Sequence, residues 1–494
     1  MVLPVIYDKI AIKKRGKIYA RTFGKVWFNG MIFSSLLFLF FFLPLVLAAY
    51  YLVPRRLKNF CLVVFSLAFY AWGEPVYVLL MVLTILVDYC CGLLIGRFLE
   101  RPGRAKAVIV GNILINLGLL GWFKYAGLLV STLDSLTGLP IPVPEVALPI
   151  GISFYTFESI SYAVDVYRRK APPMKNIVNF AAYLSFFPHL VAGPIVRYEY
   201  LQAQVLERQE TMEKFTSGMT RFCQGLFKKV LLSNNLASFA DRVQYLGDPS
   251  TLAAWLGILA FTFQIYFDFS GYSDMAIGLG KMFGFDLPEN FDHPYVSRSV
   301  SEFWRRWHMT LGRWFREYVY IPLGGNRAGT LRTVRNLAVV WLLTGMWHGA
   351  SWNFALWGIY YGVLIICEKL FLGRLLEKLP VFFQWLYSFL AAVIGWVFFS
   401  YTDLSAAFAM LRAMFGFPAA GAGTLGGYGL LTFGPLLAGG AGWTTPLVGC
   451  RAGRLRTSGK VGKVVWTAGF LLLFTAAMTH LVDNSYNPFL YAQF

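Results

Sequence analysis

Two histidines forty residues apart, His308 and His348, are the side chains of this chain best suited to chemistry. Each lies among tryptophans, the first in SEFWRRWHMTLGRWF and the second in TGMWHGASWNFALWG. A histidine in an apolar membrane segment is costly to keep there, so it is a candidate functional residue. Because imidazole transfers protons near neutral pH, the pair indicates general acid–base catalysis.

The two histidines are expected at different depths in a bilayer. Basic residues crowd the segment around His308, which predicts a cytoplasmic interface there: Arg298, Arg305, Arg306, Arg313 and Arg316. If a helix enters the bilayer near Asn336, His348 lies roughly 18 Å inside. One histidine would then face the cytosol and the other the far side, as two-sided substrate handling requires. The alternative is that His308 is a packed interfacial residue and that His348 is satisfied by another buried polar group.

Helical spacing makes further predictions around His308. A continuous helix through this segment would pair Glu302 with Arg306 and place Trp304 and His308 on one face. Arg305 would share a face with His308, where its planar guanidinium could bind the phosphates of an anionic substrate. The alternative is a structural role, in which these arginines only anchor the helix to lipid headgroups.

Two acids, Asp268 and Asp274, fall inside the otherwise apolar segment FQIYFDFSGYSDMAIGLGKMFGF. Aspartate in a membrane helix normally pairs with another polar group. A structural hydrogen bond that holds a kink near Gly271 explains them at least as well as catalysis does.

The elements that carry these residues are membrane helices. The chain has 494 residues, of which 57% are hydrophobic and 14% are charged, and its mean hydropathy is +0.56. Soluble domains carry about a quarter charged residues. Apolar runs of near-bilayer length recur along the chain: 32–53, 76–95, 107–122, 337–347, 382–399 and 464–482. These runs predict a polytopic all-α membrane protein.

The net charge of +19 does not indicate nucleic-acid binding, because the basic residues form short clusters between apolar runs. Such clusters are typical of cytoplasmic loops, which predicts that Arg55 and Arg101 face the cytoplasm and Glu74 the outside. The six cysteines are scattered without a metal-ligand spacing, so no metal is expected.

Residues 1–30 differ from the rest of the chain. They carry seven basic residues and one acid, and Met31 directly precedes the first apolar run. We interpret residues 1–30 either as a start site assigned too far upstream or as a basic arm that lies on anionic lipid. Residues 31–494 are predicted to form a single membrane domain.

Several segments, in this order, resemble the membrane-bound O-acyltransferase family and its bacterial alginate-type polysaccharide O-acetyltransferase branch. They are FFPHLVAGPIVRY, IYFDFSGYSDMAIGLGKMFGF, LPENFDHPY, EFWRRWHMTLGRWFREYVYIPLGGNR, TGMWHGASWNFALWG and NPFLYAQF. The likeness runs from Met31 to Phe494. The chain departs from the branch at His189, Gly312 and Tyr361, of which Tyr361 could alter the lining of a channel.

The resemblance implies a bundle of about 10–13 spans, with re-entrant and interfacial helices around a central channel. It matches His348 to the family's catalytic histidine and His308 to the second motif histidine. Burial would keep His348 neutral and able to accept a hydroxyl proton. Further residues of the motifs are candidates for donor binding or for the channel: Trp304, Arg305, Trp307, Asp268, Asp274, Asn290, Trp347 and Asn353. Trp347, Trp352 and Trp357 would either wall a dry pocket or serve as ordinary packing aromatics.

The activity implied is O-acetylation of an exopolysaccharide such as alginate, directly or through a periplasmic partner protein. The donor would be acetyl-CoA or another cytosolic acyl thioester, and no bound cofactor or metal is implied. The expected location is the bacterial cytoplasmic membrane, in contact with lipid. The alternative is a transporter or flippase for a polysaccharide or a lipid-linked precursor, although such proteins usually show repeated halves, which this sequence lacks.

Overall fold

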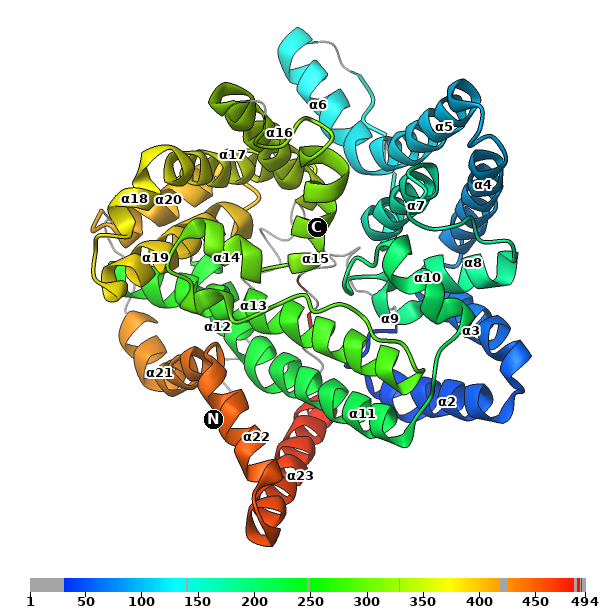
Figure 1. The fold of residues 1–494 in the computed structure, drawn as a ribbon. Coiled ribbons are helices and arrows are strands. Elements are labelled where there is room, and N and C mark those ends of the chain that lie inside the picture. Colours follow the sequence, from blue (N-terminus) through cyan, green and yellow to red (C-terminus); the bar gives the residue numbers. More distant parts are fainter. Residues whose placement is uncertain are drawn as a thin grey trace.

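The computed structural model describes residues 31–138, 141–144, 146–246, 249–327, 329–417, 425–483, 487, 488 and 490. Within these ranges the regular elements are all helices, which confirms the predicted all-α membrane bundle (Figure 1). The basic extension at residues 1–30 lies outside the described residues.

The first part of the chain forms short and medium helices, some interrupted by π-helical turns. They are η1 (Phe38–Phe42), α2 (Leu43–Leu52), η2 (Arg55–Leu57), α3 (Lys58–Gly73), α4 (Tyr77–Arg97), α5 (Pro102–Leu120), η3 (Gly121–Tyr125), α6 (Ala126–Thr137), α7 (Ile152–Tyr167), α8 (Ile177–Leu184), α9 (Phe187–Leu190), α10 (Tyr198–Leu206), α11 (Met212–Phe227), η4 (Lys228–Ser233) and α12 (Asn234–Tyr245).

The second part begins with the longest helix and carries both histidine motifs. Its elements are α13 (Thr251–Met282), η5 (Pro294–Val296), α14 (Val300–Arg306), α15 (Met309–Phe315), η6 (Arg316–Tyr320), α16 (Thr330–His348), α17 (Trp352–Cys367), η7 (Glu368–Leu372), α18 (Gly373–Leu376), α19 (Val381–Ser400), α20 (Leu404–Met414), α21 (Leu425–Trp443), α22 (Pro446–Thr457) and α23 (Lys460–Asp483).

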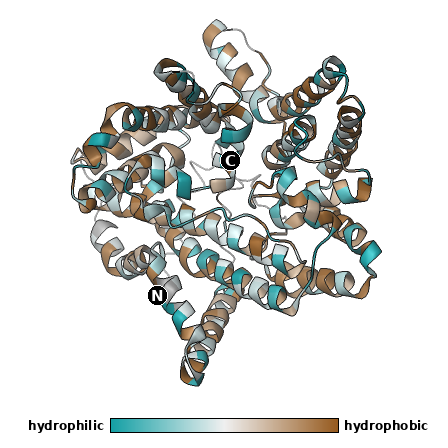
Figure 2. Ribbon diagram, in the orientation of Figure 1, coloured by the Kyte–Doolittle hydropathy of each residue, from teal (hydrophilic) through white to brown (hydrophobic). Residues whose placement is uncertain are grey.

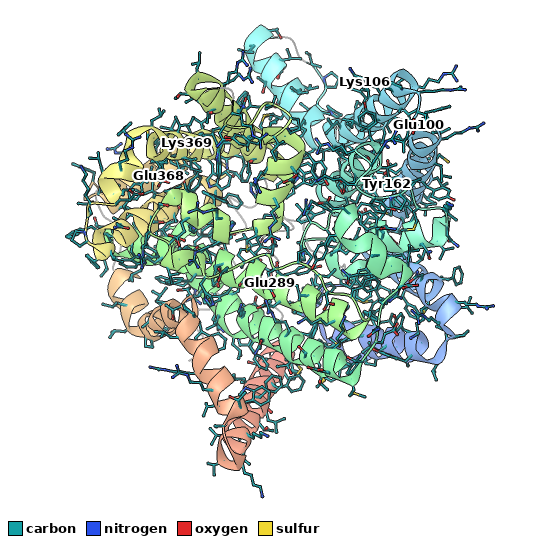
Figure 3. All side chains as sticks on the ribbon, viewed as in Figure 1. Glu100, Lys106, Tyr162, Glu289, Glu368 and Lys369 are labelled. Atoms are coloured by element: carbon teal, nitrogen blue, oxygen red, sulfur yellow. The ribbon has the colours of Figure 1, made fainter. Side chains whose placement is uncertain are left out.

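Six helical segments of the described part are long and apolar enough to cross a bilayer. They are α4, α5 continued through α6, α13, α17 continued through α18, α19 and α23. The resemblance implied about 10–13 spans, and two further apolar helices, Phe38–Leu52 and Leu404–Met414, are shorter than a crossing requires. Brown, hydrophobic ribbon covers much of the outer helices (Figure 2), whereas the charged Glu100 and Lys106 lie at the periphery near the turn between α4 and α5 (Figure 3).

Helix α13 forms the interior of the bundle, and glycines let α11 approach its backbone closely. A Cβ atom on Gly271 would lie 2.8 Å from the Gly225 carbonyl oxygen, and one on Gly278 would lie 2.6 Å from the Gly218 carbonyl oxygen. Real Cβ atoms do not approach that closely, so larger residues would force the helices apart. Helix α13 continues without interruption through Gly271, which allows the close packing of α11 against α13.

Candidate active site

The two motif histidines contact the same indole ring, that of Trp347. The ring centroid of Trp347 is 6.0 Å from that of His308 and 5.0 Å from that of His348. Phe157 stacks on the same indole at 5.4 Å, and Phe154 contacts its edge at 5.5 Å. His308 is 1% exposed and His348 is 3% exposed. The histidines therefore belong to one buried aromatic cluster rather than to two separate faces of the protein.

The helix that carries His308 is interrupted at this residue. Helix α14 ends at Arg306 and α15 begins at Met309, and between them His308 takes the left-handed conformation with φ +45° and ψ 52°. This conformation is strained for a residue with a Cβ atom, and such strain clusters at functional sites. The prediction that Trp304 and Arg305 share a helical face with His308 is wrong, because it assumed an unbroken helix. Arg305 is exposed, whereas His308 is buried.

The start of α14 follows local capping rules. The Ser299 hydroxyl accepts a hydrogen bond from the backbone N–H of Glu302 at 3.0 Å, which satisfies a free donor of the first turn. The Glu302 carboxylate accepts the Arg298 backbone N–H at 2.9 Å and also binds the Arg306 guanidinium at 2.9 Å. The predicted pair of Glu302 and Arg306 is confirmed, and it lies at the surface end of the helix.

Asn290 fixes the orientation of His308. Its Oδ1 atom lies 2.9 Å from His308 Nδ1 and also accepts the Thr310 hydroxyl at 2.9 Å. Because the Thr310 backbone N–H points to the same atom at 3.4 Å, this atom is the amide oxygen, and His308 Nδ1 must donate. The proton then sits on Nδ1 and the lone pair on Nε2. The Asn290 amide group donates in turn to Ser273 of α13 at 3.0 Å, and burial lowers the pKa of His308 to about 3.

Aromatic walls surround His348 at the end of α16. The Trp357 ring centroid lies 4.9 Å from the imidazole, and the Phe399 ring centroid lies 5.4 Å from it. Trp347 closes a third side. Trp347 and Trp357 are thus buried against the imidazole, whereas Trp352 is 59% exposed. A buried apolar surround favours a neutral imidazole, which is the form that can accept a proton.

Glycines bring the helix of His348 against α17. A Cβ atom on Gly345 would lie 2.3 Å from the Phe354 carbonyl oxygen, and one on Gly358 would lie 2.4 Å from the Trp341 carbonyl oxygen. The two backbones therefore meet without side chains between them. Asn353 joins this unit to α19, because its amide group donates to a backbone carbonyl of α19 at 3.1 Å. Asn353 thus links the start of α17 to α19.

The tryptophans of the first motif extend the same aromatic cluster. Trp304 meets Trp357 at 5.3 Å and Tyr361 at 4.9 Å between ring centroids. Trp307 is 2% exposed and meets Trp396 of α19 at 4.8 Å. Tyr361, which the resemblance set apart from the family pattern, is fully buried among these rings. These residues pack against the rings that surround the imidazoles, for example Trp304 against Trp357.

The buried carboxylate of Asp268 forms an ion pair. Its Oδ1 atom lies 2.6 Å from the Lys229 ammonium, and its Oδ2 atom accepts the Leu490 backbone N–H at 2.8 Å. Lys229 also donates to the Pro488 carbonyl. Asp268 therefore ties the C-terminal segment to the core.

Asp274 lies between two cations of the neighbouring helical segment. Its carboxylate oxygens lie 2.7 Å from Arg221 and 2.6 Å from Lys228. Breaking a buried pair by removing one partner typically costs about 3–5 kcal/mol. The contacts of both aspartates are thus those of structural ion pairs.

A second buried pair escaped sequence analysis. His189 Nδ1 lies 2.9 Å from the Glu158 carboxylate, and both side chains are at most 1% exposed. The same carboxylate oxygen accepts the Val196 backbone N–H at 3.1 Å, and the adjacent Ile195 N–H donates to the Thr310 hydroxyl at 3.0 Å. His189 lies in the last turn of the short helix α9 and is fully buried. Glu158 lies inside a mostly apolar stretch of α7. An acid in such a stretch indicates a buried polar partner, so it was the feature of the sequence from which this pair could have been predicted.

The protein-family model and the relatives that match this chain are all O-acyltransferases. The model of MBOAT, the membrane-bound O-acyltransferase family, matches residues 147–410. The chain is 47% identical to the probable alginate O-acetylase of Azotobacter vinelandii over 78% of both chains. It is 43% identical to the probable alginate O-acetylase of Pseudomonas putida, over 94% of this chain and 100% of that protein. It is 34% identical to the peptidoglycan O-acetyltransferase of Helicobacter pylori, over 78% of this chain and 80% of that protein.

Proposed function

Because this chain belongs to the membrane-bound O-acyltransferase family, we propose that it transfers an acetyl group from a cytosolic acyl thioester to an exopolysaccharide hydroxyl. It is a multi-pass membrane O-acyltransferase. Its similarity to probable alginate O-acetylases favours alginate or a similar polysaccharide as the acceptor. The acetyl group would reach this acceptor directly or through a periplasmic partner protein. Acetyl-CoA suits the donor role, and the site lies in the bacterial cytoplasmic membrane.

The observation that carries this proposal is the buried cluster in which His308 and His348 both contact the indole ring of Trp347. A hydroxyl is a weak nucleophile until a base removes its proton during attack. A neutral His348 takes this proton while the hydroxyl oxygen bonds to the acyl carbonyl carbon. The carbon–sulfur bond then breaks, and the proton passes from His348 to the leaving thiolate. The overall step needs no oxidant and produces no net proton.

His308 acts beside this step from a fixed orientation. Asn290 holds its Nδ1 proton, so the lone pair of Nε2 points away from Asn290. An imidazole fixed in this way can accept a hydrogen bond from a polar group of either substrate, the acyl thioester or the polysaccharide, when that group enters the cluster. We assign it to the side of the acyl donor, because the chain on both sides of it carries exposed arginines, among them Arg305 and Arg313. Arginine suits the phosphates of an anionic thioester.

The catalytic role of His348 is tested by His348→Ala in membrane vesicles supplied with acetyl-CoA. We expect release of free thiol and acetylated polysaccharide to fall by about 10²–10⁴-fold, the range for removal of a general base. The matched control is His480→Ala, because His480 lies on α23 and contacts Asn235 rather than the cluster. Acetylation at the wild-type level in His348→Ala would remove His348 from the mechanism.

The same assay separates acyl transfer from the alternative of a polysaccharide or precursor transporter. A transporter moves polymer across the membrane without consuming the thioester. Polymer export that continues with no thioester turnover in the wild-type protein would favour the transporter.

A further inference from the structure

A lysine lies buried inside an apolar segment close to His348. Lys124 belongs to the π-helical turn η3 within the long segment formed by α5 and α6, and it is 8% exposed. Burying an ammonium is unfavourable unless its donors are satisfied, and a charge in such a segment calls for a specific partner. A π-helical turn inserted into an α-helix often marks a functional position.

Lys124 and its neighbour Tyr125 both donate to the last carbonyls of α16. The Lys124 ammonium donates to the Trp347 carbonyl at 2.5 Å and to the Ser153 hydroxyl at 3.3 Å. The Tyr125 hydroxyl donates to the Met346 carbonyl at 2.6 Å. Two consecutive side chains of η3 therefore bind two consecutive carbonyls immediately before His348.

These contacts provide hydrogen-bond donors for carbonyls at the C-terminal end of α16. The last four carbonyls of a helix have no N–H partner within the helix, and after His348 the chain is extended at Gly349, with φ −168°. A cation near a helix C-terminus also complements the partial negative charge there. The clasp formed by Lys124 and Tyr125 supplies both effects at the end of α16.

The clasp also fixes the indole that both histidines contact. The Lys124 ammonium lies 5.8 Å from the centre of the Trp347 ring, and the Trp347 indole N–H donates to the Ser153 carbonyl at 3.4 Å. Because Ser153 also accepts from Lys124, the three residues close a triangle of hydrogen bonds around the backbone and the ring of Trp347.

We propose that Lys124 and Tyr125 are positioning residues for acyl transfer, which hold the end of α16 so that His348 keeps its place beside Trp347 and His308. This inference rests on the proposed role of His348 as the base. Neither residue needs to touch substrate. Their effect should appear in the rate of the chemical step, because a displacement of about 1 Å at a catalytic group costs up to about 10²-fold.

The test uses Lys124→Met, Lys124→Arg and Tyr125→Phe in the full-length chain. Membrane vesicles that contain each variant and the polysaccharide receive acetyl-CoA, and thiol release is measured as a function of its concentration. We expect Lys124→Met to lower the maximal rate about 10–100-fold and Tyr125→Phe about 3–10-fold, by the same displacement argument. The apparent KM for acetyl-CoA should stay within about twofold, and Lys124→Arg should recover part of the rate because it retains a charged donor.

The matched control for Tyr125→Phe is Tyr77→Phe. Tyr77 also donates to a backbone carbonyl, that of Ala147 at 2.9 Å, so its variant loses the same kind of bond but leaves the carbonyls of α16 with their partners. We expect this control to keep the wild-type rate. Equal losses in Tyr125→Phe and Tyr77→Phe would show that the effect is general destabilisation and would overturn the inference.

The outcomes separate the inference from the function on which it rests. Wild-type rates in Lys124→Met and Tyr125→Phe, with His348→Ala inactive, would overturn the clasp alone. An active His348→Ala would overturn the proposed base itself. If Lys124→Met does not accumulate in the membrane, Tyr125→Phe decides the question, because it retains the ring and removes only one hydroxyl.

Discussion

His308 and His348 lie in the same aromatic cluster but are held by different physical means. His308 stands at a break between two short helices, and a directional hydrogen bond from its Nδ1 atom to Asn290 sets its orientation. His348 ends a long helix, and three aromatic rings around it restrict its position. The first arrangement fixes which nitrogen carries the proton, whereas the second fixes a dry location.

This difference indicates how each histidine should respond to substitution of its surroundings. A hydrogen-bonded histidine depends on a single polar partner, and its loss should change the chemistry more than the fold. A histidine held by packing depends on the fit of two helix backbones, so a small increase in volume should disturb both position and stability. Substitutions of the neighbours can therefore separate the two modes.

The largest effect is expected where α16 meets α17. Gly345→Ala or Gly358→Ala would place a Cβ atom against a backbone carbonyl that cannot move away. Overpacking of this kind costs about 1–3 kcal/mol or more, so we expect a lower Tm and loss of most of the activity. Thermal unfolding in detergent and acetylation in membranes measure the two effects.

The matched control for the glycine variants is Gly118→Ala on α5, where a new Cβ atom would meet no other atom within 4 Å. We expect its Tm and activity to match those of the wild type. A wild-type Tm in Gly345→Ala would contradict the close packing of the two helices.

A smaller and more selective effect is expected at Asn290. Asn290→Ala removes the acceptor of His308 and Thr310, and leaving such buried groups unsatisfied costs about 1–3 kcal/mol. We expect the maximal rate to fall about 10–100-fold, the usual effect of losing the partner that orients a histidine. Asn290→Asp keeps an oxygen for both donors and should retain more activity than Asn290→Ala.

Asn336→Ala serves as the control for Asn290→Ala. Asn336 is equally buried and donates to the Gly325 carbonyl at 2.9 Å, but it lies at the other end of α16 from His348. Similar rates for the alanine variants of Asn290 and Asn336, at equal amounts of folded protein, would mean that Asn290 has no special role at His308.

Sequence analysis predicted what depends on composition and on short spacings. The apolar runs gave the all-α membrane class, the four-residue spacing gave the pair of Glu302 and Arg306, and the motifs singled out His308 and His348. Each of these depends on residues that are neighbours in the chain. The family resemblance added the order of the motifs and the role expected of His348.

Contacts between distant segments were beyond sequence analysis. Lys124 meets Trp347 across 223 positions, and His189 meets Glu158 from another helix. Neither pairing follows from any local periodicity, although a charged residue inside an apolar run is a usable signal. The break at His308 was missed for a different reason: a non-glycine residue with φ +45° is uncommon, so spacing rules assume a continuous helix.

The smallest effect is expected at the surface beside His308. Arg305 is exposed at the end of α14, and the break after Arg306 separates it from the buried imidazole. If its charge attracts an anionic thioester, Arg305→Ala should raise the apparent KM for acetyl-CoA about two- to fivefold, since an exposed charge contributes up to about 1 kcal/mol. The maximal rate should not change, and the effect should weaken as salt screens the charge.

Two further variants complete the Arg305 experiment: Lys106→Ala is the control for lost charge, and His308→Ala tests the neighbouring histidine. Lys106 lies at the periphery near the start of α5 (Figure 3), so its removal changes the net charge equally without altering the surface beside His308. We expect Lys106→Ala to leave the KM unchanged and His308→Ala to weaken the reaction on the donor side, through a higher donor KM. A lower maximal rate with unchanged donor dependence in His308→Ala would instead place His308 in the chemical step. Identical KM values for Arg305→Ala and Lys106→Ala would reduce the arginines around His308 to anchors for lipid headgroups.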